Sequence, residues 1–260
     1  MAAATGLAVS CNYYAQPLLD TIARQFAISH TTAGLLVTTA QLAYGLGLLL
    51  LVPLGDRFER RRMIVVMTVL TAVGLLVTAS ATGIGMAMAG TALTGLTTVV
   101  AQLLVPLGAT LAAPEERGRV VGTLMSGLML GVLLGRTVAG VLADVGGWRT
   151  VYWLSAPLML AMAVLLWRAL PRHAQRVDMP YLALIASVVR LLRDEPVLRV
   201  RAVLGAIIFA VFSVLWTSLA FLLAAPPYGY SDATIGLFGL AGAAGVLGAS
   251  TAGRLADPAA

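Results

Sequence analysis

The chain has 260 residues, of which 60% are hydrophobic and only 11% are charged, and its formal net charge is +6. A soluble domain carries about 25% charged residues, so this composition excludes an ordinary soluble protein and predicts an all-α polytopic membrane protein. All 17 basic residues are arginines that cluster beside apolar runs, which indicates control of membrane topology and not nucleic-acid binding.

Eight apolar runs are long enough, or nearly so, to cross a bilayer, which takes about 20 residues as a helix. They lie at about residues 2–19, 32–54, 63–79, 84–112, 120–143, 150–170, 202–225 and 233–252. Between the sixth and seventh runs, residues 171–200 are charged and hold a short apolar segment, Tyr181–Leu192. We expect an amphipathic helix at the membrane surface there, because a ninth span would invert the last two spans and spoil the arginine bias.

The arginines also predict the orientation. Fourteen lie in loops on one side of the predicted spans, and two, Arg24 and Arg149, lie on the other. Because cytoplasmic loops carry the excess of basic residues, we expect the first side and both termini to be cytoplasmic, in a bacterial plasma (inner) membrane.

The loop between the second and third spans is the most informative motif. It reads Leu54-Gly55-Asp56-Arg57-Phe58-Glu59-Arg60-Arg61-Arg62, and the flanking residues 25–55 and 63–114 are uncharged. It resembles the signature loop of the major facilitator superfamily, G-x-L-a-D-r-x-G-r-r. Leu54, Asp56, Arg57, Arg60 and Arg61 match this pattern, while Val52 and Glu59 replace its two glycines.

The resemblance implies a role for the loop as a conformational latch between two halves of a transporter, formed by Asp56, Arg57, Arg60 and Arg61, with Asp257 as the counterpart of Asp56 in the second half. A plain topology anchor is the alternative. Asp56 separates the two, because an anchor needs the arginines but has no use for a carboxylate. Glu59 in place of glycine is expected to alter the turn.

An internal repeat supports the resemblance. Ser29-x-x-Thr32-x-Gly34 opens the second span, and Ser231-x-x-Thr234-x-Gly236 opens the eighth. The two spans end 22 and 21 residues after those glycines, at Asp56 and at Asp257 within Gly253-Arg254-Leu255-Ala256-Asp257. Two copies in one orientation predict parallel halves. We expect a six-helix N-terminal half over 1–170, a cytoplasmic linker over 171–200, and the first two helices of an incomplete second half over 201–260, truncated after about eight of the family's twelve spans.

The fifth span carries a stripe of glycines at a stride of four, Gly127, Gly131 and Gly135. Small residues at this spacing let helices pack closely. The fifth and eighth helices meet across the halves in the family, so a rocking interface is the functional interpretation. The span lacks the Gly-Pro pair of the drug-antiporter subgroup.

Polar residues at membrane depth normally face a cavity or another helix. Asn12 and Gln16 lie four residues apart on one face of the first span. The family implies that the first, fourth and seventh helices line the substrate path, so we favour Asn12, Gln16, Gln102 and Trp216. Further candidates are Gln41, Tyr44, Ser213 and Thr217, whereas Tyr13 and Tyr14 also fit an aromatic belt.

Arg136 is the one arginine inside a predicted span. It lies eight residues before Asp144, roughly 12 Å along a helix from the outer end. A charge at this depth costs about 2.5–3.5 kcal/mol on insertion scales, so something must offset it. We expect Arg136 to bind an anionic substrate group or a coupling carboxylate. A structural arginine, bonded to helix carbonyls or paired with Asp144, is the alternative.

These features predict a secondary transporter that moves a small molecule by alternating access, in proton-coupled efflux, and Arg136 favours an anionic substrate. A non-transporting fragment or membrane interaction partner is the alternative. An intramembrane enzyme is disfavoured, because no predicted span core holds Asp, Glu or His. The single Cys11 and two distant histidines exclude a disulfide framework and a metal pair, and we expect no cofactor.

Overall fold

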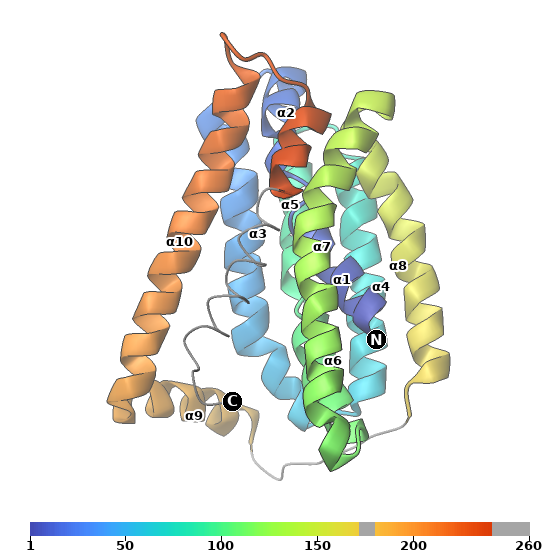
Figure 1. Ribbon diagram of the computed structural model, residues 1–260, viewed down its shortest axis with the longest axis vertical. Coiled ribbons are helices and arrows are strands. Elements are labelled where there is room, and N and C mark those ends of the chain that lie inside the picture. The colour runs from blue at the N-terminus through green and yellow to red at the C-terminus, as the bar shows by residue number, and fades with distance from the viewer. Residues whose placement is uncertain (172–179, 241–260) are drawn as a thin grey trace, which may run out of the picture.

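The computed structural model describes residues 1–171 and 180–240. In that part of the chain every regular element is helical, and the helices stand side by side as a bundle (Figure 1). In chain order the elements are α1 (Ala2–Cys11), η1 (Gln16–Leu18), α2 (Leu19–Phe26), α3 (His30–Leu50), η2 (Val52–Asp56), α4 (Arg60–Ala79), α5 (Ile84–Thr97), α6 (Val100–Leu111), η3 (Pro114–Glu116), α7 (Arg117–Gly146), α8 (Thr150–Ala169), α9 (Tyr181–Asp194) and α10 (Pro196–Ala224). A further helical segment begins at residue 232 and is described to residue 240.

The polytopic all-α prediction is confirmed. Six helical stretches in the described part are long and apolar enough to cross a membrane: His30–Gly55, Arg60–Ala79, Ile84–Leu111, Pro114–Gly146, Thr150–Ala169 and Pro196–Ala224. They correspond to the predicted second to seventh spans. The predicted eighth span begins in the described residues, and the rest of it lies outside them.

Two predicted spans are not continuous helices. The first breaks after Cys11, where turns and the 3₁₀ turn η1 replace the α-helix before it resumes in α2. Pro17 within η1 cannot donate a helical hydrogen bond, which fits a break at this point. The fourth span breaks between α5 and α6 at Thr98 and Val99. The sequence prediction did not include either break, because the length of an apolar run gives no information on the backbone conformation within it.

The repeated serine motif has a structural basis in helix capping. Ser29 precedes α3, and its Oγ accepts a hydrogen bond from the Thr32 amide at 3.1 Å. Ser231 precedes the helical segment 232–240 in the same way, and its Oγ accepts from the Thr234 amide at 3.3 Å. Each serine satisfies a backbone donor that a helix N-terminus leaves unpaired. Both copies of the motif therefore open a helix.

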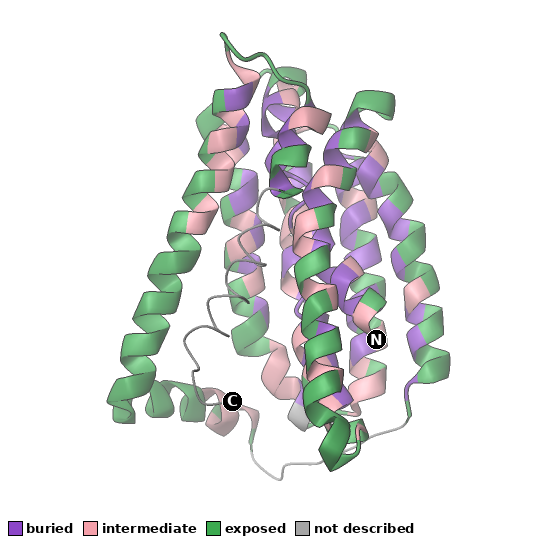
Figure 2. Cartoon of the chain, in the orientation of Figure 1, coloured by how far each residue is buried: buried purple, intermediate pink, exposed green. Residues whose placement is uncertain are grey.

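Helices α1 to α8 form a compact N-terminal bundle, and α10 stands beside it with the segment 232–240. We call α10 and this segment the C-terminal pair. The upper end of the molecule in Figure 1 holds α2 and residues 225–231, and the lower end holds η2, η3 and α9. The buried residues of α10, Ala220 and Leu223, both lie near its upper end. Figure 2 shows α10 exposed along most of its lower length.

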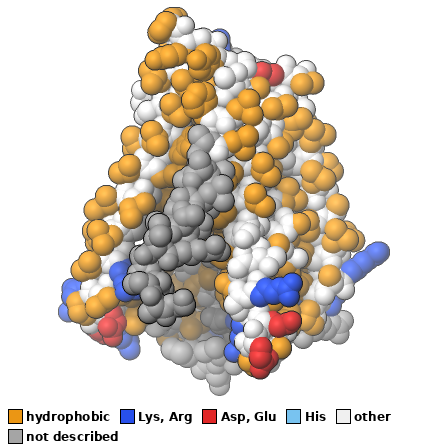
Figure 3. Space-filling model, viewed as in Figure 1, with side chains coloured by type: hydrophobic (Ala, Val, Ile, Leu, Met, Phe, Trp, Pro, Cys, Tyr) orange, Lys and Arg blue, Asp and Glu red, His pale blue; other side chains and the backbone are white. Residues whose placement is uncertain are grey.

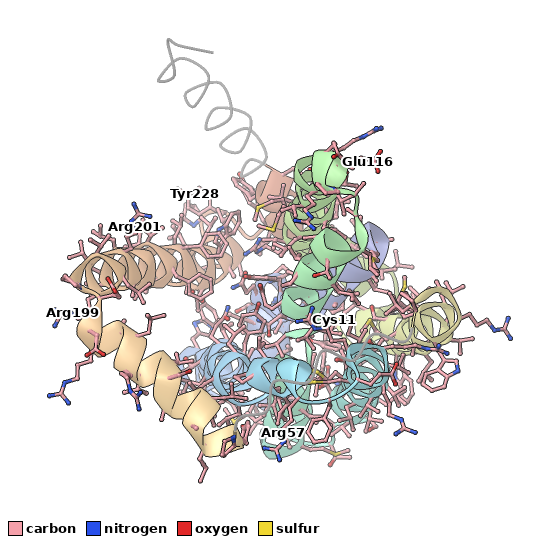
Figure 4. All side chains as sticks on the ribbon, turned by 90° about the horizontal axis from the view of Figure 1, so that it is seen from below. Cys11, Arg57, Glu116, Arg199, Arg201 and Tyr228 are labelled. Carbon is pink, nitrogen blue, oxygen red and sulfur yellow. The ribbon has the colours of Figure 1, made fainter. Side chains whose placement is uncertain are left out.

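The chemical character of the surface also differs between the sides and the lower end of the molecule. Apolar side chains cover the sides of the bundle, and charged side chains gather toward the lower end (Figure 3). Helix α9 lies across that end, roughly perpendicular to the bundle (Figure 1). It has no fully buried residue, and the hydroxyl of Tyr181 donates a 2.7 Å hydrogen bond to the Leu50 carbonyl. Seen from below, Arg57, Arg199 and Arg201 extend from the lower end toward its periphery (Figure 4). This geometry fits the surface helix expected for residues 181–192.

Candidate functional site

The buried guanidinium of Arg136 is the centre of the candidate site. Arg136 lies on α7 and is 2% exposed. Its Nε donates a 2.6 Å hydrogen bond to Oε1 of Gln16 in η1, and its Nη1 donates a 3.0 Å bond to the Val132 carbonyl one turn earlier. The break in the first span places Gln16 at this point. The side chain is therefore held by two different elements.

Three aromatic rings surround the same guanidinium. Its Cζ lies 4.6 Å from the ring centroid of Tyr13, 4.5 Å from that of Trp216 and 5.1 Å from that of Phe212. Phe212 and Trp216 are four residues apart on α10, so they share one face of that helix. Each such contact stabilises a desolvated cation by roughly 0.5–2 kcal/mol. Arg136 therefore joins the N-terminal bundle to the C-terminal pair.

The site has spare hydrogen-bond donors. Among the described residues, Nη2 of Arg136 and Nε2 of Gln16 are buried without a hydrogen-bond partner. The ion pairs found in that part of the chain join Asp20 to Arg24 and His30 at the upper end, and none involves Arg136. The crevice beside Arg136, which Gln16, Trp216 and Ile235 also line, holds about 10 Å³. That is about the room for one water molecule, so a larger ligand requires α10 to move away.

A second group of polar side chains comes from Asn12, which follows α1, and from α3 and α6. Asn12 Nδ2 donates to Gln41 Oε1 at 3.4 Å, and Gln102 Nε2 donates to the Tyr44 hydroxyl at 3.2 Å. Gln41 lines a cavity of about 530 Å³ between α3 and α10, opposite Ser213. Two buried atoms of this group, Asn12 Oδ1 and Gln41 Nε2, lack a partner among the described residues, as does Oγ of Ser213 across the cavity.

The structure brings the predicted path residues together in part. Gln16, Trp216 and Arg136 meet at one point, whereas Asn12 and Gln102 belong to the second polar group. Of the two alternatives for Arg136, a bond to a helix carbonyl is present, but the Asp144 carboxylate accepts from the Ala233 amide at 3.3 Å. Phe212 was not among the residues favoured from the sequence, and Tyr13 was left open between the interior and an aromatic belt, since nothing local links either residue to α7.

The predicted latch is described only in part. The side chain of Asp56 and the whole of Asp257 lie outside the described residues. Arg57 is exposed, Arg60 Nε donates to the Gly55 carbonyl at 3.3 Å, and the Arg61 guanidinium lies 4.3 Å from the Trp167 ring centroid. The arginines thus contact their own loop and α8, and the latch remains a prediction.

The glycine stripe of α7 lies against α1. A Cβ added at Gly127 would lie 2.5 Å from the Ala2 carbonyl oxygen, and one at Gly135 would lie 2.8 Å from the Ser10 Cβ. Gly131 approaches Gly6 more closely still. The glycine stripe therefore allows α7 to pack closely against α1 within the N-terminal bundle. The contact with the segment 232–240 is made further along α7, where Thr137 Oγ1 donates to the Gly236 carbonyl at 3.1 Å.

The described residues contain no group of three or more His, Cys, Asp or Glu side chains placed to hold a metal ion. The buried polar groups described above are amides, hydroxyls and one guanidinium. This set can bind and orient a polar ligand through its donors and acceptors.

Comparison with known proteins identifies relatives. A family model described as Major Facilitator Superfamily matches residues 1–259. The putative uncharacterized transporter YgaY of Escherichia coli strain K12 is 62% identical over 91% of this chain and 60% of its own length. The probable transporter SCO4007 of Streptomyces coelicolor is 34% identical over 99% of this chain and 60% of its own length. The chain thus spans about 60% of the length of these curated relatives.

Similarity to solved structures agrees with the fold. The crystal structure of a bacterial homolog of the human lysosomal transporter Spinster, in an inward-facing and unoccupied conformation, superposes with a TM-score of 0.70 at 16% identity. The match covers 90% of this chain and 57% of that protein. The shared feature is the arrangement of the helices in a bundle.

Proposed function

Because the chain belongs to the major facilitator superfamily, we propose that it forms part of a secondary transporter that moves a small molecule through the space between the N-terminal bundle and the C-terminal pair. The observation that carries this proposal is the buried Arg136, which contacts both parts and keeps an unpaired donor. The family and the relatives named above are transporters and not enzymes.

We infer alternating access from where the two parts touch. The buried residues of α10 lie near the upper end, and the hydrogen bonds from Thr21 to Asp232 and from Ala233 to Asp144 also join the parts there. The lower part of α10 is exposed, and residues 209–218 further along the same helix border the 530 Å³ cavity. The structure therefore fits a state that is closed at the upper end. The opposite state requires these contacts to break.

We infer an anionic substrate group from the balance of donors and acceptors. A carboxylate, sulfonate or phosphate accepts paired hydrogen bonds from a guanidinium edge. Arg136 offers a free Nη2, and Gln16 offers a free Nε2 beside it. Among the described residues no carboxylate neutralises this cation, so an anion would offset part of the cost of its burial. Gln41 and Ser213 are positioned to contact the rest of the substrate.

We further propose that the coupling ion is the proton, that the direction is efflux, and that the protein resides in the bacterial inner membrane with both termini in the cytoplasm. The arginine bias of the loops and the bacterial relatives support the location. Coupling and direction rest on the family resemblance.

Ligand stabilisation of the purified chain tests the anion site. A ligand that binds only the folded state raises the unfolding temperature with its concentration. We expect at least one anion from a panel of acetate, benzoate, phosphate and sulfate to stabilise the wild type and the control Arg119→Gln, whose arginine is exposed on the same helix. Arg136→Gln should lose this stabilisation. Arg136→Lys should keep only part of it, since lysine keeps the positive charge but lacks the paired N–H donors of a planar guanidinium.

Circular dichroism of each variant distinguishes a lost site from a lost fold. Equal stabilisation of wild type and folded Arg136→Gln by every anion would show that Arg136 does not bind the substrate.

A further inference from the structure

A second set of contacts joins the two parts at the upper end, around Asp232. The hydroxyl of Thr21 in α2 donates a 2.6 Å hydrogen bond to Oδ2 of Asp232. The next amide, that of Ala233, donates to Asp144 on α7. Gly140 on α7 lies directly against the Asp232 backbone, where no larger side chain fits. Asp232 therefore lies in the contact that closes the upper end.

Closure buries this carboxylate among other acids. Asp232 is 9% exposed. The charged groups near it are Asp144 on α7 and Asp20 and Arg24 on α2. Arg24 binds Asp20 at 2.5 Å, and His30 of α3 lies 3.2 Å from the same carboxylate, so the bases pair with Asp20. Among the described residues, Asp232 has a hydrogen bond but no ion pair.

The environment of Asp232 favours its neutral form. Burial raises the pKa of the Asp232 carboxyl above its ordinary value, and Asp144 and Asp20 raise it further. The Thr21 hydrogen bond and the Arg24 charge lower the pKa without cancelling the rise. A proton on Oδ1 leaves Oδ2 free to accept from Thr21, so protonation keeps the hydrogen bond that holds the two parts together.

We propose that Asp232 is a proton-binding site whose protonation favours closure of the upper end. The site takes a proton from the solvent on the side to which the upper end opens, as the carboxylate becomes a carboxylic acid. This inference rests on the alternation proposed above. It is independent of Arg136 and of the identity of the substrate.

The sign of the effect follows from linkage. In an open state Asp232 meets water and has an ordinary pKa, whereas in the closed state its pKa is raised. The closed state therefore binds the proton more tightly, and lower pH favours it. Between the two pKa values one proton changes the ratio of closed to open molecules by up to about tenfold per pH unit.

A distance measurement across the upper end tests this. Val145 on α7 and Tyr228 after α10 are 83% and 48% exposed, which suits spin labels on Val145→Cys and Tyr228→Cys. The one native cysteine, Cys11, is replaced by serine. In the full chain in lipid nanodiscs, we expect a short distance to dominate at pH 5 and a longer one to grow toward pH 8.

Substitutions assign the titrating group. Asp232→Asn mimics the neutral acid and should stay closed across the range. Asp144→Asn removes a charge that repels the ionised Asp232 carboxylate in the closed state, so the closed population at pH 8 should rise and the pH-dependent change should become smaller. His30→Asn and the lower-end control Glu116→Gln should keep the wild-type transition.

A pH-independent distance in the wild type, or an unchanged transition in Asp232→Asn, would overturn the proposal. So would loss of the transition in His30→Asn. The readout needs no substrate, so failure of the anion site at Arg136 would leave this result untouched, and failure here would leave that site intact.

Discussion

Alanine at Gly131 should separate α1 from α7. A Cβ at this position would lie 2.7 Å from both the carbonyl carbon and the Cα of Gly6. Carbon atoms pack at about 3.5 Å or more, so the backbones must move apart by about 0.8 Å. Overpacking of this kind costs about 1–3 kcal/mol, and the gain from replacing a helical glycine offsets about 0.5–1 kcal/mol. We expect Gly131→Ala to destabilise the protein by about 1–2 kcal/mol.

Gly122→Ala is the matched control on the same helix. Gly122 is exposed, and an added Cβ meets no atom within 4 Å among the described residues. This variant should be neutral or more stable by up to about 1 kcal/mol. Reversible unfolding in mixed detergent micelles, followed by circular dichroism, compares the two free energies. Equal stability of the two variants would refute the close packing of α1 on α7.

Three further predictions address the site, the latch and the topology. Gln16→Leu should leave Arg136 Nε unpaired and lower the free energy of unfolding by about 1–3 kcal/mol, measured by thermal denaturation; an unchanged melting temperature would contradict the 2.6 Å bond. Asp56→Asn should slow labelling of engineered cysteines on one membrane face while insertion stays normal, and unchanged labelling on both faces would make Asp56 a bystander. Reporter fusions at Met1 and Ala260 should both report cytoplasm, and a periplasmic signal from either would reject the eight-span topology.

Much of the fold could be predicted because the thickness of the bilayer fixes how long an apolar run must be to form a spanning helix. The predicted third and sixth spans differ from α4 and α8 by a few residues, because charged loops flank them. Helix α7 runs from Arg117 to Gly146, beyond its predicted span at both ends, since the helix continues past the apolar core. The break at Thr98 could not be predicted, since no Gly or Pro marks it.

The sequence predicted the central residue of the candidate site, but not all of the residues that surround it. Arg136 stands out because a charge in an apolar run is costly. Its partners Gln16 and Trp216 come from distant parts of the chain, and they were favoured only because the family implies which helices line the path. Phe212 and Asp232 gave no such signal, because an aromatic residue in a span and an acid beside a helix start are ordinary. Their roles depend on how the C-terminal pair packs on the N-terminal bundle.

Two-sided accessibility of the space between those parts tests the central claim most directly. Ser213 on α10 lines the 530 Å³ cavity, and a single cysteine there, with Cys11 replaced by serine, can be labelled by a membrane-impermeant maleimide. Leu182→Cys on the exposed face of α9 is the one-sided control. Alternating access predicts that Ser213→Cys reacts both in intact cells with a permeable outer membrane and in inside-out vesicles, whereas Leu182→Cys reacts in the vesicles alone. Reaction of Ser213→Cys from one face only would contradict the account.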